Sequence, residues 1–292
     1  MKTGLFFLVT LFSLVCYGQQ RPDSLTYDSL HDAEIRLIGL GTNMIQSGDE
    51  SMRLFNGRSF LITLSRALRI KNSYFYRFDS LNCASILYSP DDAFRIITWN
   101  VVLNNETFHY FGVIQLNPVF MKSIKDTSNL RSVYPLIDRS SQIRNPMDTT
   151  LGPEFWYGAN YYQIIPVMNK GKKAYTLLGW NGSTMMTNKK IVDYLFFDLN
   201  RPRFGAPVFD LKDPRYKRLP SRLIFEFSNQ ATMTLKYSVK KKFLIYESMV
   251  PPRPQDYGHP ETYLPDGSFD YLIYKKGIWE KQSGALRDFD LE

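Results

Sequence analysis

From about Ser73 to its end, the chain alternates short runs rich in Phe, Tyr, Ile and Val with short segments rich in Pro, Gly, Asn and Asp. Such runs are typical of strands, and such segments are typical of turns. The connections are too short for the crossover helices that parallel strands need, so we expect antiparallel pairing. The sequence therefore predicts a mainly β fold, α+β in class, with an antiparallel β domain over residues 73–292. A sandwich, an open barrel and a small propeller all fit this pattern.

Turn residues divide the β domain into strands, several of them paired as hairpins. Residues 94–102 and 107–116 flank a short polar turn, and residues 161–168 and 174–180 flank a turn that contains Gly171. The other expected strands are 74–78, 84–88, 191–197, 222–227, 231–237, 242–247, 269–275 and 277–282. The three strands between residues 222 and 247 are expected to form a meander.

The preceding segment, residues 19–72, has a helical period instead. Residues that can share one helix face recur at spacings of three and four: Leu30, Ala33, Leu37, Gly41 and Met44. Ser47 and Glu50 have the spacing of a capping box, which predicts that a second helix starts there. Asn56-Gly57 is expected to weaken or interrupt that helix.

Residues 1–18 have the parts of a secretory signal peptide. Lys2 gives a positive start, residues 5–15 form an apolar run, and Gly18 ends a cleavage pattern of small residues. Because spanning a bilayer takes ~20 apolar residues, the run predicts export rather than an anchor. Cys16 also suggests a lipoprotein, although Val15 is larger than the residue that lipid attachment requires. We expect the mature chain, which has no other span, in the periplasm or at or beyond the cell surface.

If the signal is removed, Cys83 is the only cysteine left, so no intrachain disulfide can form. The protein must then be held together by its core, and Cys83 is expected to be a small buried hydrophobe. The aromatic content, 15%, is high and favours half-buried pleated surfaces.

The formal charge of +8 is carried almost entirely by the C-terminal half. Residues 19–164 hold 14 basic and 14 acidic side chains, whereas residues 165–292 hold 21 and 14, and Lys2 adds the remaining charge. Lysines often serve only as solvated turn and edge residues, but that does not explain such an excess. The basic residues expected to bind a partner are Lys172, Lys189, Lys190, Arg215, Lys217 and Arg218. This hypothesis requires that the cations gather on one surface once the strands pair.

The sequence favours envelope partners over nucleic acid, because an exported protein rarely meets DNA or RNA. Anionic envelope lipid and acidic glycan are the expected partners, since clustered cations bind such surfaces. An aromatic set near Gly158 could stack on sugar rings, and its candidates are Trp156, Tyr157, Tyr161 and Trp180. The same residues could instead form a buried seam of the core.

No catalytic motif is present, and no cofactor is predicted. The chain lacks the nucleophile elbow, the phosphate-binding loop and the paired-histidine zinc motif, and none of its three histidines has a partner at metal-ligand spacing. His259, in a Gly-His-Pro-Glu segment, is the histidine best placed for function. The leading hypothesis is a non-catalytic binding or envelope-accessory protein. The alternatives are an exported hydrolase assembled from distant loops and an assembly protein that docks a partner through its N-terminal helices.

Several segments together resemble an uncharacterised family of exported bacterial proteins. They lie between about residues 85 and 280 and comprise 89–100, 156–162, 178–182, 204–209 and 265–270. The resemblance implies export and a β fold, and it brings no activity and no catalytic residues.

Overall fold

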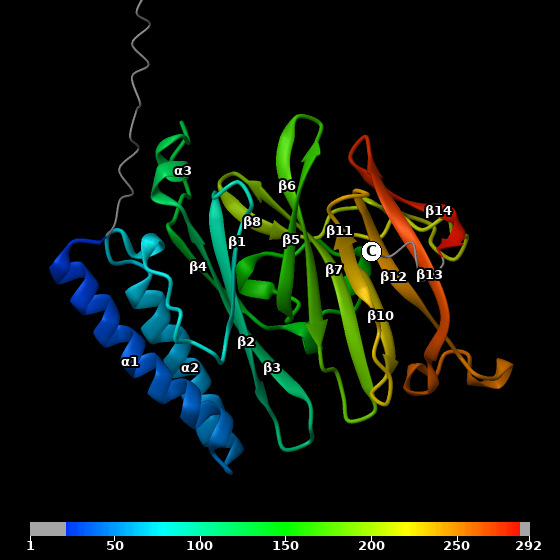
Figure 1. The fold of residues 1–292 in the computed structure, drawn as a ribbon, viewed down its shortest axis with the longest axis horizontal. Helices are drawn as coiled ribbons and strands as arrows, with labels where there is room; N and C mark the ends of the chain where they lie inside the picture. The colour runs from blue at the N-terminus through cyan, green and yellow to red at the C-terminus, as the bar shows by residue number, and fades with distance from the viewer. Residues whose placement is uncertain (1–21, 287–292) are drawn as a thin grey trace, which may run out of the picture.

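The structure, a computed structural model, describes residues 22–286 as two long helices followed by three β-sheets (Figure 1). The mainly β fold with helices at the N-terminus is therefore confirmed. The signal peptide predicted for residues 1–18 lies outside the described residues. Within residues 22–286, no helix combines the length and the apolarity that crossing a bilayer requires.

The helices α1 (Ser24–Gln46) and α2 (Glu50–Ala67) pack side by side at one end of the molecule. The predicted capping box is wrong, because Ser47 ends α1 and Asp49 caps α2 by accepting a 2.9 Å hydrogen bond from the Met52 amide. Asn56-Gly57 does not interrupt α2. Gly57 instead lets the helix approach the sheet, since a Cβ there would lie 2.8 Å from Val101.

The first sheet follows in the order β1-β2-β3-β4, and all its pairs are antiparallel. Its strands are β1 (Ser85–Tyr88), β2 (Phe94–Val102), β3 (Phe108–Leu116) and β4 (Val133–Ile137), with the short helix α3 (Pro118–Lys122) between the last two. The strand expected over residues 74–78 is wrong. A 3-10 turn (Ser73–Phe75) stands there, and it buries Tyr74 edge-on against Tyr88 of β1.

The second sheet has the order β5-β6-β7-β10, with β8 added to β7. Its strands are β5 (Asn160–Asn169), β6 (Lys172–Asn181), β7 (Thr187–Asp198), β8 (Arg201–Phe204) and β10 (Leu223–Ser228). The meander expected over residues 222–247 is wrong, because β10 pairs with β7 rather than with the strand that follows it. Both faces of this sheet are covered, so β10 completes a buried layer.

The third sheet has the order β11-β12-β13-β14-β9. Its strands are β9 (Phe209–Asp210), β11 (Leu235–Ser238), β12 (Phe243–Val250), β13 (Leu264–Lys275) and β14 (Ile278–Leu286). The β9–β14 pair is parallel, whereas the others are antiparallel.

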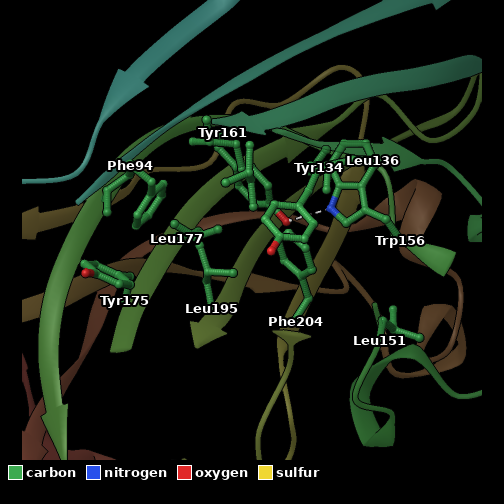
Figure 2. Packing of buried hydrophobic residues seen from close by; sticks show 14 of the residues in the cluster. Phe94, Tyr134, Leu136, Leu151, Trp156, Tyr161, Tyr175, Leu177, Leu195 and Phe204 are labelled. Atoms are coloured by element: carbon green, nitrogen blue, oxygen red, sulfur yellow. Dashed lines mark hydrogen bonds between the residues drawn. The ribbon is translucent and has the colours of Figure 1, made fainter. Parts of the chain in front are cut away.

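The helices and the three sheets form successive layers, and each neighbouring pair of layers shares a core. Alternate residues of β2 point to opposite sides, so Ile97 and Trp99 meet the helices while Phe94 and Ile96 meet the second sheet. Figure 2 shows the core between the first two sheets, where Phe94 packs edge-on against Tyr175. A third core joins the second and third sheets. The architecture is thus an open stack of layers, rather than a two-sheet sandwich, an open barrel or a propeller.

Cys83 is half-buried beside α1. A Cβ on Gly41 would lie 2.6 Å from its Sγ atom, so glycine is needed for this contact. Burial raises the pKa of the Cys83 thiol, which keeps it protonated and unreactive at neutral pH.

Candidate functional site: a lysine edge

Three hairpin turns of the second and third sheets lie at the same end of the molecule. They connect β5 to β6, β11 to β12 and β13 to β14, and strand register places the last two beside each other because Phe243 pairs with Ile273. The β5–β6 and β13–β14 tips project together at the top of Figure 1. They also touch, because a Cβ on Gly277 would lie 2.6 Å from the Asn169 side-chain oxygen.

The local sequence explains two of these turns. Lys170-Gly171 and Lys276-Gly277 both have positive φ at each residue, between 48° and 90°. This is the backbone of the two-residue hairpin turn that matches strand twist, and glycine adopts it without strain. The glycines therefore set the turns, and the lysines beside them project into solvent.

Eight exposed lysines occupy these turns and their flanks. We call them the lysine edge: Lys170, Lys172, Lys173, Lys240, Lys241, Lys242, Lys275 and Lys276. Asp91 of the β1–β2 turn forms a 2.7 Å ion pair with Lys173, and Asp198 ends β7. The edge therefore keeps a strong net positive charge.

The other cations expected to bind a partner lie away from this edge. Lys189 and Lys190 are on β7, where Lys189 pairs with Glu226 at 3.5 Å and Lys190 stands 4.9 Å over the Tyr162 ring. Burial lowers the pKa of Lys190. Both lysines are thus held by neighbours within the sheet, and only Lys172 of the six predicted basic residues joins the lysine edge.

Arg215, Lys217 and Arg218 lie on the long segment that follows β9. They line a cleft of about 660 Å³ together with Tyr216 and other residues of this segment and of residues 145–150. Asp213 binds the Arg215 guanidinium and, through hydrogen bonds from it, has its pKa lowered to about 2. The charge of Arg215 in this cleft is thus balanced by a carboxylate.

The prediction that Trp156, Tyr157 and Tyr161 bind a partner near Gly158 is wrong. All three are buried, so they belong to the core and cannot stack on a sugar. Trp180 is half-buried, donates a 3.2 Å hydrogen bond to Asn188 and packs edge-on against Phe108. The packing explains the nearby glycine, since a Cβ on Gly158 would lie 2.6 Å from Tyr110.

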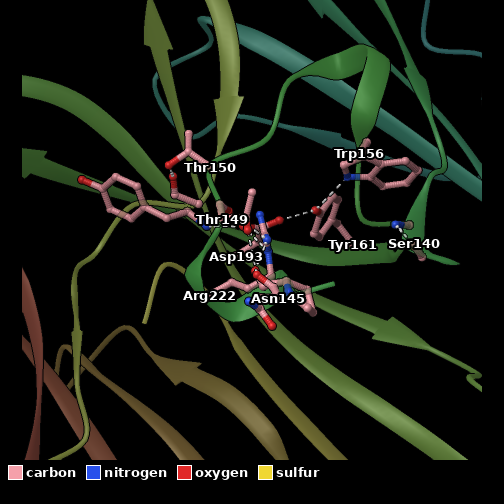
Figure 3. A network of polar contacts seen from close by, with 12 residues as sticks. Ser140, Asn145, Thr149, Thr150, Trp156, Tyr161, Asp193 and Arg222 are labelled. Carbon is pink, nitrogen blue, oxygen red and sulfur yellow. Dashed lines mark hydrogen bonds and ion pairs between the residues drawn. The ribbon is translucent and has the colours of Figure 1, made fainter. Parts of the chain in front are cut away.

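The buried aromatic set supports an ion pair that the sequence analysis missed (Figure 3). Arg222 and Asp193 are both fully buried and are joined by a 3.2 Å contact from Nε. Tyr161 donates to the same carboxylate at 3.0 Å, and Trp156 donates to the Tyr161 hydroxyl at 3.1 Å. Arg222 also donates to the Thr149 carbonyl, while its Nη2 atom has no partner among the described residues.

The histidines do not form the contacts that hydrolysis by a serine nucleophile requires. His259 is on an exposed loop and lies 3.2 Å from Glu261. His109 lies 3.9 Å from Asp138, but it is Asp138 rather than the histidine that accepts the 2.6 Å hydrogen bond from Ser140. Among residues 22–286, no group of three His, Cys, Asp or Glu side chains is placed to hold a metal ion.

Compared with protein-family models, curated proteins and solved structures, the chain matches none. The resemblance to exported bacterial proteins therefore stays a prediction, and any function has to be argued from the geometry above.

Proposed function

We propose that the protein is an exported, non-catalytic binding protein of the cell envelope that holds an anionic surface on its lysine edge. The carrying observation is that eight exposed lysines from three hairpin turns gather at one end of the molecule. An anionic lipid surface is the preferred partner, because its charge is spread over an area as the lysines are.

Acidic glycan is the weaker choice. The aromatic rings that would stack on sugars are in the core, and the edge itself is formed by flexible lysine side chains. A compact glycan site needs fixed polar groups around a pocket, whereas a lipid surface requires only that the charges face it together.

The energy available from such an edge is sufficient. A lysine near an anionic membrane contributes about 1 kcal/mol, so several acting together give measurable binding. The attraction acts over a Debye length of roughly 8 Å at physiological salt, and it should therefore weaken steeply as salt is added.

The test is sedimentation of the protein with vesicles of equimolar phosphatidylglycerol and phosphatidylcholine, compared with pure phosphatidylcholine. The edge variant replaces Lys170, Lys172, Lys240, Lys242 and Lys276 by Gln. It should bind the anionic vesicles at least about a hundredfold more weakly than the original protein.

A matched control loses the same charge elsewhere, through replacement of Arg36, Arg58, Arg66, Lys217 and Arg218 by Gln. Net charge alone would make both variants bind equally weakly and would refute the edge as the site. Salt-insensitive binding, or binding to acidic glycan with none to vesicles, would also count against this partner.

Assembly through the helices is the second candidate. The solvent face of α2 exposes Met52, Phe55 and Ile62, each more than half accessible. The opposite face packs on the first sheet, so α2 can dock a partner only with this outer row. Replacing Phe55 by Gln should leave the protein folded and should abolish any self-association or co-purifying partner.

A further inference from the structure

A second positively charged site lies in the N-terminal half, apart from the lysine edge. The end of α2, the following turn, α3 and the start of β4 enclose a cleft of about 820 Å³. We call it the α2 cleft. Figure 1 shows that α2 ends on the same side of the molecule as α3. A volume of this size is typical of small-molecule sites.

The lining of the cleft combines cations with an apolar wall. Arg69, Lys71 and Lys122 are exposed at its rim. Its apolar residues are Leu68, Ile70, Leu116, Pro118 and Met121, and the remaining ones are uncharged: Asn72, Ser73, Tyr74, Gln115 and Ser132. No carboxylate is among the described residues that line it, so its field is positive.

A buried arginine increases this field from below. The fully buried Arg95 donates from Nε to the Gln115 side chain at 2.7 Å and from Nη2 to the Ser73 carbonyl at 2.9 Å, and both acceptors line the cleft. Its other guanidinium hydrogen bonds go to the Tyr76 carbonyl and the Tyr88 hydroxyl. Every acceptor is formally neutral, so no carboxylate bonds the guanidinium directly; the Asp92 carboxylate lies further away, where it accepts a 2.7 Å hydrogen bond from the Tyr74 hydroxyl.

Hydrogen bonds also fix the side chains at the floor of the α2 cleft. Gln115 donates to both the Leu68 carbonyl and the Ser73 hydroxyl, and Ser73 in turn donates to Leu68. These bonds fix the neutral groups between Arg95 and the opening, so that a bound anion would meet a preorganised surface.

We propose that the α2 cleft binds an organic anion: a phosphate or carboxylate group carried on a short apolar chain or ring. The charged group lies between the rim cations, and the apolar part lies against Leu116 and Met121. Such a group could belong to a soluble metabolite or to a lipid headgroup, and the two sources share this chemistry.

The test uses octyl phosphate below its micelle concentration, with neutral octyl glucoside and inorganic phosphate as comparison ligands. Binding is measured calorimetrically and by displacement of anilinonaphthalene sulfonate, a fluorescent anion. We expect octyl phosphate to bind saturably and octyl glucoside to bind at least about tenfold more weakly. Equal binding of these two detergents would overturn the proposal.

The rim variant replaces Arg69, Lys71 and Lys122 by Gln. These three positions are exposed, so the replacements should leave folding intact. The rim variant should bind octyl phosphate about tenfold more weakly. The control replaces the exposed residues Arg36, Arg58 and Arg203 by Gln, removes the same charge away from both sites and should bind octyl phosphate normally. A second variant, Ser132→Phe, fills the cleft without changing charge and should also lose binding.

The outcomes separate the two sources and the two sites. If the original protein binds octyl phosphate and the rim variant does not, the ligand is a soluble one. Phosphatidic acid vesicles are tested on the five-lysine edge variant, which removes binding by the lysine edge. Binding seen only with these vesicles, and lost when the rim residues are also replaced, indicates a headgroup. If neither probe binds, or if the rim variant binds both normally, the α2 cleft is not an anion site, whatever the result for the lysine edge.

Discussion

Arg95 and Arg222 are both fully buried, yet their charges are balanced in different ways. Arg222, in the second sheet, contacts the buried carboxylate of Asp193 and leaves one nitrogen without a partner. Arg95, in the first sheet, is held by neutral oxygens and lies 5.3 to 5.6 Å from the centres of three aromatic rings. Burial lowers the pKa of Arg95, while nearby Tyr88 partly opposes that shift.

The comparison separates two uses of a buried cation. A guanidinium paired with a carboxylate cancels its charge locally, so Arg222 ties β7 and β10 together and exerts little field outside. A guanidinium held by neutral groups keeps its field, and Arg95 projects that field into the α2 cleft. The cost of burying a charge is met in the first case by an ion pair and in the second by hydrogen bonds and cation–π contacts.

The largest expected effect comes from breaking the ion pair on one side. Asp193→Asn should lower the free energy of unfolding by about 3 to 5 kcal/mol, because it leaves Arg222 buried and unpaired. Urea unfolding would measure the loss. The double variant Asp193→Leu with Arg222→Met should recover much of it, since both charges are removed. Equal losses in the single and double variants would show that the pair does not act as a unit.

Replacing Arg95 should lower the free energy of unfolding less than Asp193→Asn does. No second substitution should restore that lost stability, because Arg95 has no charged partner to remove. Arg95→Met should cost about 2 to 3 kcal/mol, since it leaves the Gln115 side chain and two backbone carbonyls without donors. It should also weaken anilinonaphthalene sulfonate binding, which Arg222→Met should not do. An unchanged dye affinity in a folded Arg95→Met protein would argue against a field from this residue.

Alkaline pH should produce a smaller effect beside Arg222. Burial, reinforced by the negative charge of Glu226 and opposed by the positive charge of Arg222, raises the pKa of Tyr157 to about 12. The stability from the neutral phenol is therefore complete below pH 10, the usual pKa of tyrosine, and is lost as the pH rises towards 12. The loss should reach about 2 kcal/mol at pH 12. Tyr157→Phe should flatten this part of the stability curve, and an unaltered slope would contradict the assignment.

Much of the local structure could be predicted from the sequence. The β2–β3 and β5–β6 hairpins and the amphipathic α1 have periodic signatures, and the predicted bounds of the two hairpins differ from the observed ones by no more than two residues. The position of β10 could not be predicted. Its alternating apolar residues are compatible with pairing to the next strand in the sequence and equally with pairing to β7. Only packing on the second sheet decides between them.

In the candidate sites too, some features could be predicted from the sequence and others could not. Lys170 and Lys172 are visible as turn lysines, but only the packing of the second sheet on the third places them beside Lys240 and Lys276. The two buried arginines leave no signature, since Arg222 reads as the first residue of a strand and Arg95 as an outward strand position. The aromatic residues near Gly158 fit two roles, because buried cores and sugar-binding surfaces use the same residue types.

The order of β9 and β10 has a consequence for how the molecule is assembled. Most layers follow the order of the chain, so each can dock on its predecessor as the polypeptide emerges. β9 departs from this rule, because it comes before β10 but belongs to the third sheet, whereas β10 closes the second. β9 must wait for β14, the last strand, to find its partner. In a nascent chain the second sheet can therefore be completed when β10 arrives, whereas the third sheet is completed only when its C-terminal hairpin arrives.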